Sequence, residues 1–86
     1  MSGKRIGVIG IVIDQHQAVV AQVNTIISAY SNMIIGRMGI PRPEDNTGVI
    51  ALIVEGSTDE VGAFTGKLGN LPGVTVKSAL TAKKNG

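Results

Sequence analysis

The 86-residue sequence predicts a single α+β domain whose elements follow the order strand, helix, strand, strand, helix, strand. Three observations predict this fold class. Two apolar runs rich in Ile and Val, residues 5–13 and 49–55, have the composition of strands. Two later segments space their apolar residues three or four positions apart, as amphipathic helices do. Each helical segment follows one of the apolar runs and precedes a further, shorter strand.

The first strand and helix are predicted by a change of period in the sequence. Residues 5–13, RIGVIGIVI, are apolar on both alternating faces, which is typical of a strand covered on both sides. Asp14 is the expected N-cap of the following helix, with Gln17 at its third position. That helix should span about residues 15–30. Its apolar face consists of Val19, Val23, Ile26, Ile27 and Tyr30.

The second half of the chain repeats this pattern after a further strand. Residues 33–40, MIIGRMGI, are expected to form the second strand, and the Pro- and Asp-containing segment 41–48 a loop. Residues 49–55 form the third strand, and Ser57 begins the second helix as part of a capping box. The last strand is expected over residues 74–79. Flexible tails are predicted at residues 1–4 and 80–86.

This order is the split β-α-β-β-α-β pattern of ferredoxin-like folds, an antiparallel sheet with two helices on one face. The first and third strands are central in that fold, and they are the two strands that are apolar on both faces. The edge strands contain Arg37 and Lys77, charges of the kind that limit pairing at a sheet edge. Helices cover only one face of such a sheet. We therefore expect a homo-oligomer, a dimer or a tetramer, formed through the open sheet face.

The composition excludes several classes of function. The chain contains no cysteine, which excludes disulfides, thiolate chemistry and thiolate-bound clusters. Its net charge is only +2, with no basic stripe and just one Phe and one Tyr, so direct nucleic-acid binding is not expected. The first apolar run, residues 6–13, is too short for a membrane span or a signal peptide. We expect a cytoplasmic protein that does not contact the membrane.

Few residues are candidates for chemistry. His16 is the only histidine, and one imidazole without thiolates provides too few ligands for a metal site within one chain, so no metal and no cofactor are predicted. No Ser or Thr has an identifiable base with an orienting acid, so we do not expect an enzyme. Arg37 either decorates an edge strand or pairs with a carboxylate or an anionic ligand.

Three stretches carry a family resemblance: RIGVIGIVI, MIIGRMGIP and GSTDEVGAFTGKLGNLPGVTVKSA. These stretches and their spacing resemble the iron-only hydrogenase system regulators, over roughly residues 4–80. The resemblance implies a prokaryotic single-domain protein of ferredoxin-like fold, linked with iron-only hydrogenase systems. It supplies no ligand-binding or catalytic residue that can be transferred to this chain.

The pattern is also similar to ACT-type regulatory domains, through the Leu-Pro-Gly-Val entry at residues 71–74, and to the ligand-sensing domain of nickel-responsive repressors. The chain lacks the Pro-Gly usual after the first strand of amino-acid-binding ACT domains, and the histidines and cysteine that hold nickel. The likeness to ACT-type domains places a ligand site at a subunit boundary near the first strand–helix turn. The candidate ligand-binding residues are therefore Asp14, Gln15, His16 and Gln17, followed by Arg37.

The expected function is that of a non-enzymatic regulatory or sensor module that binds a small effector or a protein partner as a homo-oligomer. Two alternatives remain open. One is an enzyme or a metal-binding protein with an interfacial site around His16 and Arg37. The other is a scaffold that acts only through protein–protein interaction.

Overall fold

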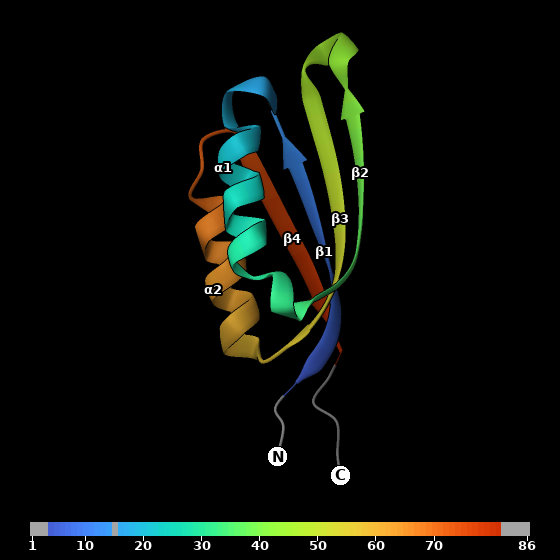
Figure 1. The fold of residues 1–86 in the computed structure, drawn as a ribbon, viewed down its shortest axis with the longest axis vertical. Coiled ribbons are helices and arrows are strands. Elements are labelled where there is room, and N and C mark those ends of the chain that lie inside the picture. Colours follow the sequence, from blue (N-terminus) through green and yellow to red (C-terminus); the bar gives the residue numbers. More distant parts are fainter. Residues whose placement is uncertain (1–3, 15, 82–86) are drawn as a thin grey trace.

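The computed structural model describes residues 4–14 and 16–81 of the chain. A four-stranded antiparallel sheet forms one layer, and both helices pack against one of its faces (Figure 1). This arrangement confirms the predicted α+β, ferredoxin-like fold. The elements are β1 (Arg5–Ile13), α1 (His16–Ala29), a 3-10 turn (Ser31–Met33), β2 (Ile34–Arg42), a second 3-10 turn (Pro43–Asp45), β3 (Thr47–Gly56), α2 (Thr58–Gly69) and β4 (Val74–Leu80).

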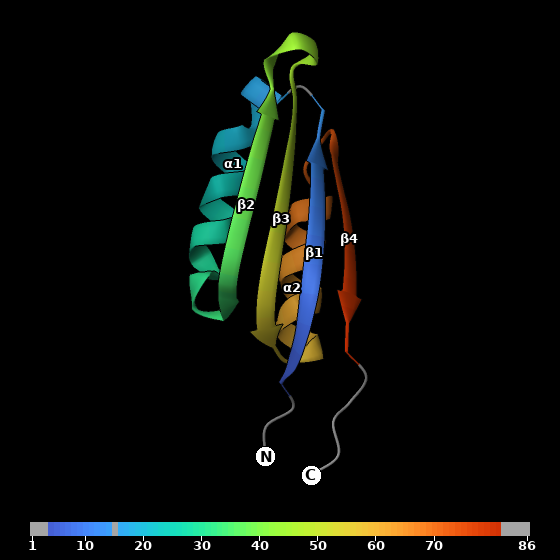
Figure 2. The same cartoon turned by 90° about the vertical axis from the view of Figure 1, so that its right-hand side faces the viewer.

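The strand order is β2-β3-β1-β4, so β1 and β3 are central and β2 and β4 are the edges (Figure 2). Ile9 of β1 pairs with Leu52 of β3 on one side and with Ser78 of β4 on the other. The sequence predicted these central and edge positions from the β-α-β-β-α-β pattern, with the two-sided apolarity of the first and third strands as a cross-check, and the structure confirms them. All three pairings are antiparallel.

The core lies between the sheet and the helices. Alternate residues of β1 and β3 are buried there, and Phe64 of α2 is fully buried among them. The ring of Tyr30 packs against Phe64 with 5.0 Å between the ring centroids. The other buried side chains from the main elements are Ile9, Ile11, Ile13, Val19, Val23, Ile27, Ile50, Leu52, Val54, Val61 and Leu68.

The opposite face of the sheet is also apolar, and no described residue covers it (Figure 2). The intervening residues of β1 and β3 point to this side, because successive side chains of a strand alternate between its two faces. We call this surface the open sheet face. Its six large side chains, exposed by 43% to 64%, are Ile6, Val8, Val12, Met38, Ile40 and Ile53.

The β2–β3 hairpin is longer than the sequence predicted. Residues 41–48 were expected to form a loop, but Pro41 and Arg42 pair with Gly48 and Thr47, which leaves only residues 43–46 between the strands. Proline is tolerated here because β2 is an edge strand, where its missing N–H can face solvent. Arg42 also forms exposed ion pairs across the turn, to Glu44 at 3.3 Å and to Asp45 at 3.5 Å.

The predicted element ends are otherwise close to those observed. β4 continues to Leu80, one residue beyond the predicted strand, and the Thr81 N–H donates a hydrogen bond to the Ile6 carbonyl at 3.0 Å. The predicted tails, 1–4 and 80–86, fall largely outside the described residues. Helix α2 begins with the predicted capping box, in which the Ser57 hydroxyl accepts a hydrogen bond from the Glu60 N–H.

Candidate functional site

Four of the five predicted ligand-binding residues lie at the end of β1, in the turn after it and at the start of α1. Asp14 is exposed, and its backbone N–H donates to the Gly73 carbonyl at 2.8 Å, so this turn lies against the turn that precedes β4. Gln15 lies outside the described residues, as do the side chains of His16 and Gln17, whose backbones form the start of α1. The predicted cap by Asp14 and the role of this segment in ligand binding therefore stay predictions.

A β-bulge in β2 determines which face of the sheet Arg37 lies on. The alternation of apolar and polar residues in the sequence does not indicate this bulge. Ile34 pairs with Val54, but the next paired residue of β2 is Gly36, opposite Ile53, so Ile35 is an extra residue in the ladder. In a regular strand Arg37 would lie on the open sheet face. Because the bulge shifts the alternation by one residue, Arg37 pairs with Leu52 and lies on the side of the helices.

On that side, Arg37 contacts helix α1. Its Nη2 donates a hydrogen bond to Asn24 Oδ1 at 3.2 Å, and both residues are exposed. Among the described residues, Arg42 has ion pairs and Arg37 has none. The structure thus places Arg37 beside the middle of α1, whereas Asp14 contacts Gly73. No described contact joins these two parts of the predicted site.

A groove of about 240 Å³ lies next to Arg37, between α1 and the β2–β3 hairpin. The sequence analysis identified only Arg37 among its residues. The other lining residues come together because α1 lies alongside the hairpin. The sequence signal that could have pointed to them was the pair of glycines, Gly39 and Gly48. The other lining residues are Val20, Asn24, Gly39, Ile40, Pro41, Gly48, Val49 and Ile50.

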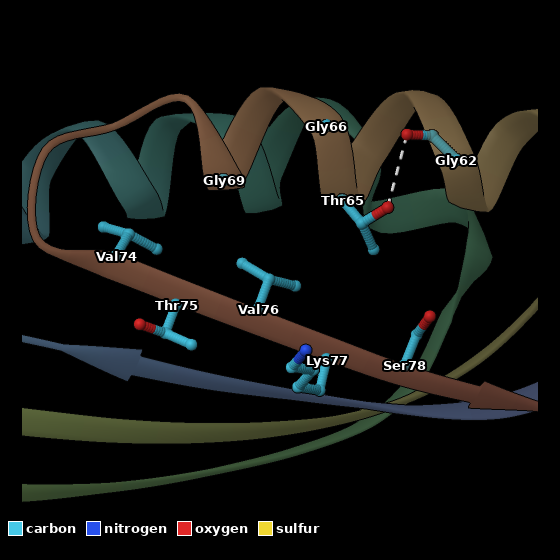
Figure 3. A pocket seen from close by; sticks show the side chains of 9 residues that line it. All are labelled: Gly62, Thr65, Gly66, Gly69, Val74, Thr75, Val76, Lys77 and Ser78. Atoms are coloured by element: carbon cyan, nitrogen blue, oxygen red, sulfur yellow. Dashed lines mark hydrogen bonds between the residues drawn. The ribbon is translucent and has the colours of Figure 1, made fainter.

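A second groove, of about 470 Å³, runs between α2 and the edge strand β4 (Figure 3). Its helical wall consists of Gly62, Gly66, Gly69 and Thr65, and residues 74–78 of β4 form the other wall. The Thr65 hydroxyl is used within the helix, where it donates to the carbonyls of Val61 at 3.0 Å and Gly62 at 3.3 Å. Lys77 is the one charged residue of this lining, so the groove presents no acid–base pair.

The ionisable groups of the described residues lie at the surface. No charged or polar side chain among them is buried, and no group of three or more His, Cys, Asp or Glu residues in this part of the chain could hold a metal ion. The pKa of Glu60 is lowered by its hydrogen bonds to the backbone and side chain of Ser57, which is a helix-capping role. Neither described helix is long and apolar enough to cross a membrane.

Comparison with known proteins identifies the family. The profile of the TM1266-like family, described as "Iron-only hydrogenase system regulator, putative", matches residues 5–78 of the chain. The chain belongs to this family. Membership in the regulator family confirms the resemblance found in the strands and in the segment that includes α2. A comparison with curated proteins found no match.

A solved structure of a regulator-family protein is similar over almost the whole chain. The uncharacterized protein TM1266 from Thermotoga maritima shares 34% sequence identity, covers 92% of this chain and 99% of its own, and superposes with a TM-score of 0.87. Two more distant structures share the fold alone. They are the C-terminal domain of the MgtC protein from Mycobacterium tuberculosis (16% identity, TM-score 0.61, 92% and 89% covered) and an unknown protein from Galdieria sulphuraria (9%, 0.62, 95% and 48%).

Proposed function

We propose that this regulator-family protein is a non-enzymatic module of an iron-only hydrogenase system and acts by binding, as a homo-oligomer assembled through the open sheet face. The observation that carries the proposal is the open sheet face itself. Six large aliphatic side chains from three adjacent strands are about half exposed there. Contiguous apolar patches of this kind mark interaction surfaces in soluble proteins.

The size of the open sheet face suits a pair of these small domains. Neighbouring strands lie about 4.8 Å apart and rise about 3.3 Å per residue, which gives the face a flat extent of roughly 20 by 25 Å. Side chains that interdigitate across it bury more than this flat area, and a standard interface buries about 800 Å² on each partner. A second copy is the simplest partner because a two-fold axis pairs the same patch with itself.

The charges on this side of the sheet lie at the border of the face. Glu55 pairs with Ile6 near one end of β3, and Lys77 lies on the edge strand β4 opposite Gly10. Between them, Gly10 pairs with Ala51, a small and uncharged pair in the middle of the face. An apolar centre with charges at the rim is the usual composition of a protein interface.

The regulatory part of the proposal requires a ligand or a partner that distinguishes two states of the oligomer. A ligand shifts an equilibrium only through different affinities for the two states. The residues proposed to bind an effector are Asp14, Gln15, His16, Gln17 and Arg37.

Thermal-shift measurements against metals, nucleotides and amino acids test the segment 14–17. A shift that the Asp14→Ala and His16→Ala variants abolish supports this site, and an unchanged shift contradicts it.

The oligomer is tested by analytical ultracentrifugation of the Ile53→Lys variant at micromolar concentration. The wild-type protein should sediment as a species larger than the 8.9 kDa monomer, and Ile53→Lys as the monomer, because it places a charge in the centre of the interface. Ala63→Lys on the exposed side of α2 is the matched control and should remain oligomeric. A wild-type monomer, or an oligomer that persists in a folded Ile53→Lys protein, contradicts the proposal.

A further inference from the structure

The groove between α1 and the β2–β3 hairpin is open because its floor lacks side chains. Gly39 and Gly48 lie on neighbouring strands and pair with Ile50 and Pro41. A Cβ atom added at Gly39 would have only the Val49 carbonyl, at 4.0 Å, within contact range. Gly39 therefore leaves room above the sheet that a larger residue would fill.

The same groove holds one cation whose hydrogen-bonding capacity is only partly used. An arginine side chain has five N–H donors. One donor of Arg37 reaches Asn24 Oδ1 at 3.2 Å, which places the guanidinium at the edge of the groove and leaves its other donors available. The bulge at Ile35 is the reason that this charge lies here and not on the open sheet face. Bulges recur where a strand must redirect a side chain at a site.

From this arrangement we infer that the groove binds a small monocarboxylate, with its carboxylate on the Arg37 guanidinium and its aliphatic body over Gly39 and Gly48. The planar guanidinium fork matches a carboxylate in a two-point contact. A single positive charge balances a single negative one. The walls suit an aliphatic body, because the apolar lining residues on the helix side of the sheet are Val20, Pro41 and Ile50.

The lining also indicates which related molecules the groove does not favour. It contains no Asp or Glu, so the ammonium group of an amino acid would lose water without gaining a charged partner. Its volume of about 240 Å³ is below the usual range for drug-sized ligands and suits a body of a few carbon atoms. An effector role for this groove rests on the proposed regulatory function. Binding of a monocarboxylate in the groove can be tested without that function.

Titration of the ¹⁵N-labelled full chain with 4-methylpentanoate, followed by two-dimensional NMR, tests the inference. We expect saturable shifts of the Gly39 and Gly48 amides and of the Asn24 side-chain NH₂. Leucine has the same carbon skeleton with an added ammonium group, and 4-methylpentan-1-ol lacks the carboxylate. Both should bind at least tenfold more weakly. Inorganic phosphate should not reproduce the saturation, because it has no aliphatic part.

Two variants and one control assign the binding to the groove. Arg37→Met should weaken 4-methylpentanoate binding at least tenfold, and Gly39→Val should block it by filling the floor. Arg42→Met is the matched control, since this arginine lies on the same strand but is paired with Glu44 and Asp45, and it should bind as the wild type does. The inference is overturned by an absence of saturable shifts, by equal binding of leucine or phosphate, or by unchanged binding in a folded Arg37→Met protein. If the wild-type oligomer dissociates in the Ile53→Lys variant, but the wild-type protein does not bind 4-methylpentanoate, the carboxylate site is overturned and the proposed oligomer is not.

Discussion

Three glycines of α2 have no role in the packing of the domain. Gly62, Gly66 and Gly69 line the groove beside β4, and a Cβ atom at any of them would meet nothing within 4 Å. A glycine in a helix interior costs about 1 kcal/mol relative to alanine. Gly73 differs, because its φ of 75° lies in the left-handed region and a Cβ atom there would lie 3.1 Å from the Asp14 carbonyl oxygen.

The Gly66→Ala variant should therefore be more stable than the wild type. We expect the free energy of unfolding to rise by about 1 kcal/mol, since alanine restricts the unfolded chain and fits the helix without a clash. Urea denaturation monitored by circular dichroism measures the change. Gly73→Ala is the companion variant, and it should lose about 1 kcal/mol or more because its backbone conformation disfavours a side chain. A Gly66→Ala protein no more stable than the wild type would contradict this account.

Helix α2 begins at a reciprocal pair of hydrogen bonds. The Ser57 N–H donates to Glu60 Oε1 at 2.9 Å, and the Glu60 N–H donates to the Ser57 hydroxyl at 3.1 Å. These bonds, with a smaller attraction from Lys4, lower the pKa of Glu60 from its ordinary value of 4.5. The carboxylate form is therefore bound more favourably in the folded protein than in the unfolded chain.

This pKa shift predicts a pH dependence of stability. With the folded pKa of Glu60 below 4.5, the unfolded chain binds more protons, so the stabilisation is complete above pH 4.5 and is lost as the pH falls through the lowered value. Glu60→Gln retains a side-chain acceptor for the Ser57 N–H but does not titrate. Urea denaturation between pH 7 and pH 3 should show a stability difference between wild type and variant that narrows toward pH 3. Asp59→Asn is the control in the same helical turn. Because it retains Glu60, its stability should still contain the part that Glu60 contributes and that is lost toward pH 3. A difference that stays constant with pH would exclude this role for Glu60.

At the scale of the whole molecule, the sheet has two apolar faces, and the chain provides helices for only one of them. That imbalance was predictable from the sequence, because β1 and β3 alternate between two apolar sets and hairpin and crossover rules leave both helices on the same side. The central strands and the capping box of α2 were predictable for similar local reasons, since period and capping chemistry depend on neighbouring residues.

Features that depend on distant contacts could not be predicted in this way. The direction of Arg37 depends on the bulge at Ile35, and an apolar strand with one extra residue has no distinct pattern in a single sequence. The pairing of Pro41 and Arg42 could not be predicted because Pro, Asp and Asn normally indicate a loop. In the structure the strand ladder continues through Pro41 and Arg42 to Gly48 and Thr47. The groove beside Arg37 likewise depends on how α1 lies along the hairpin.

The bulge in β2 also makes the chain tolerant of a change in length. Ile34 faces the helices and Gly36 the open sheet face, so joining them directly would restore the normal alternation of a strand. A variant with Ile35 deleted should therefore keep its register from Gly36 to Arg42, with Arg37 still beside Asn24, and two-dimensional NMR of the variant would show the same signals for the distal hairpin. Deletion of Met38 instead would shift the strand by one residue and exchange its two faces. Single-residue insertions and deletions among related chains are thus expected to accumulate at Ile35 and to be rare between Arg37 and Arg42.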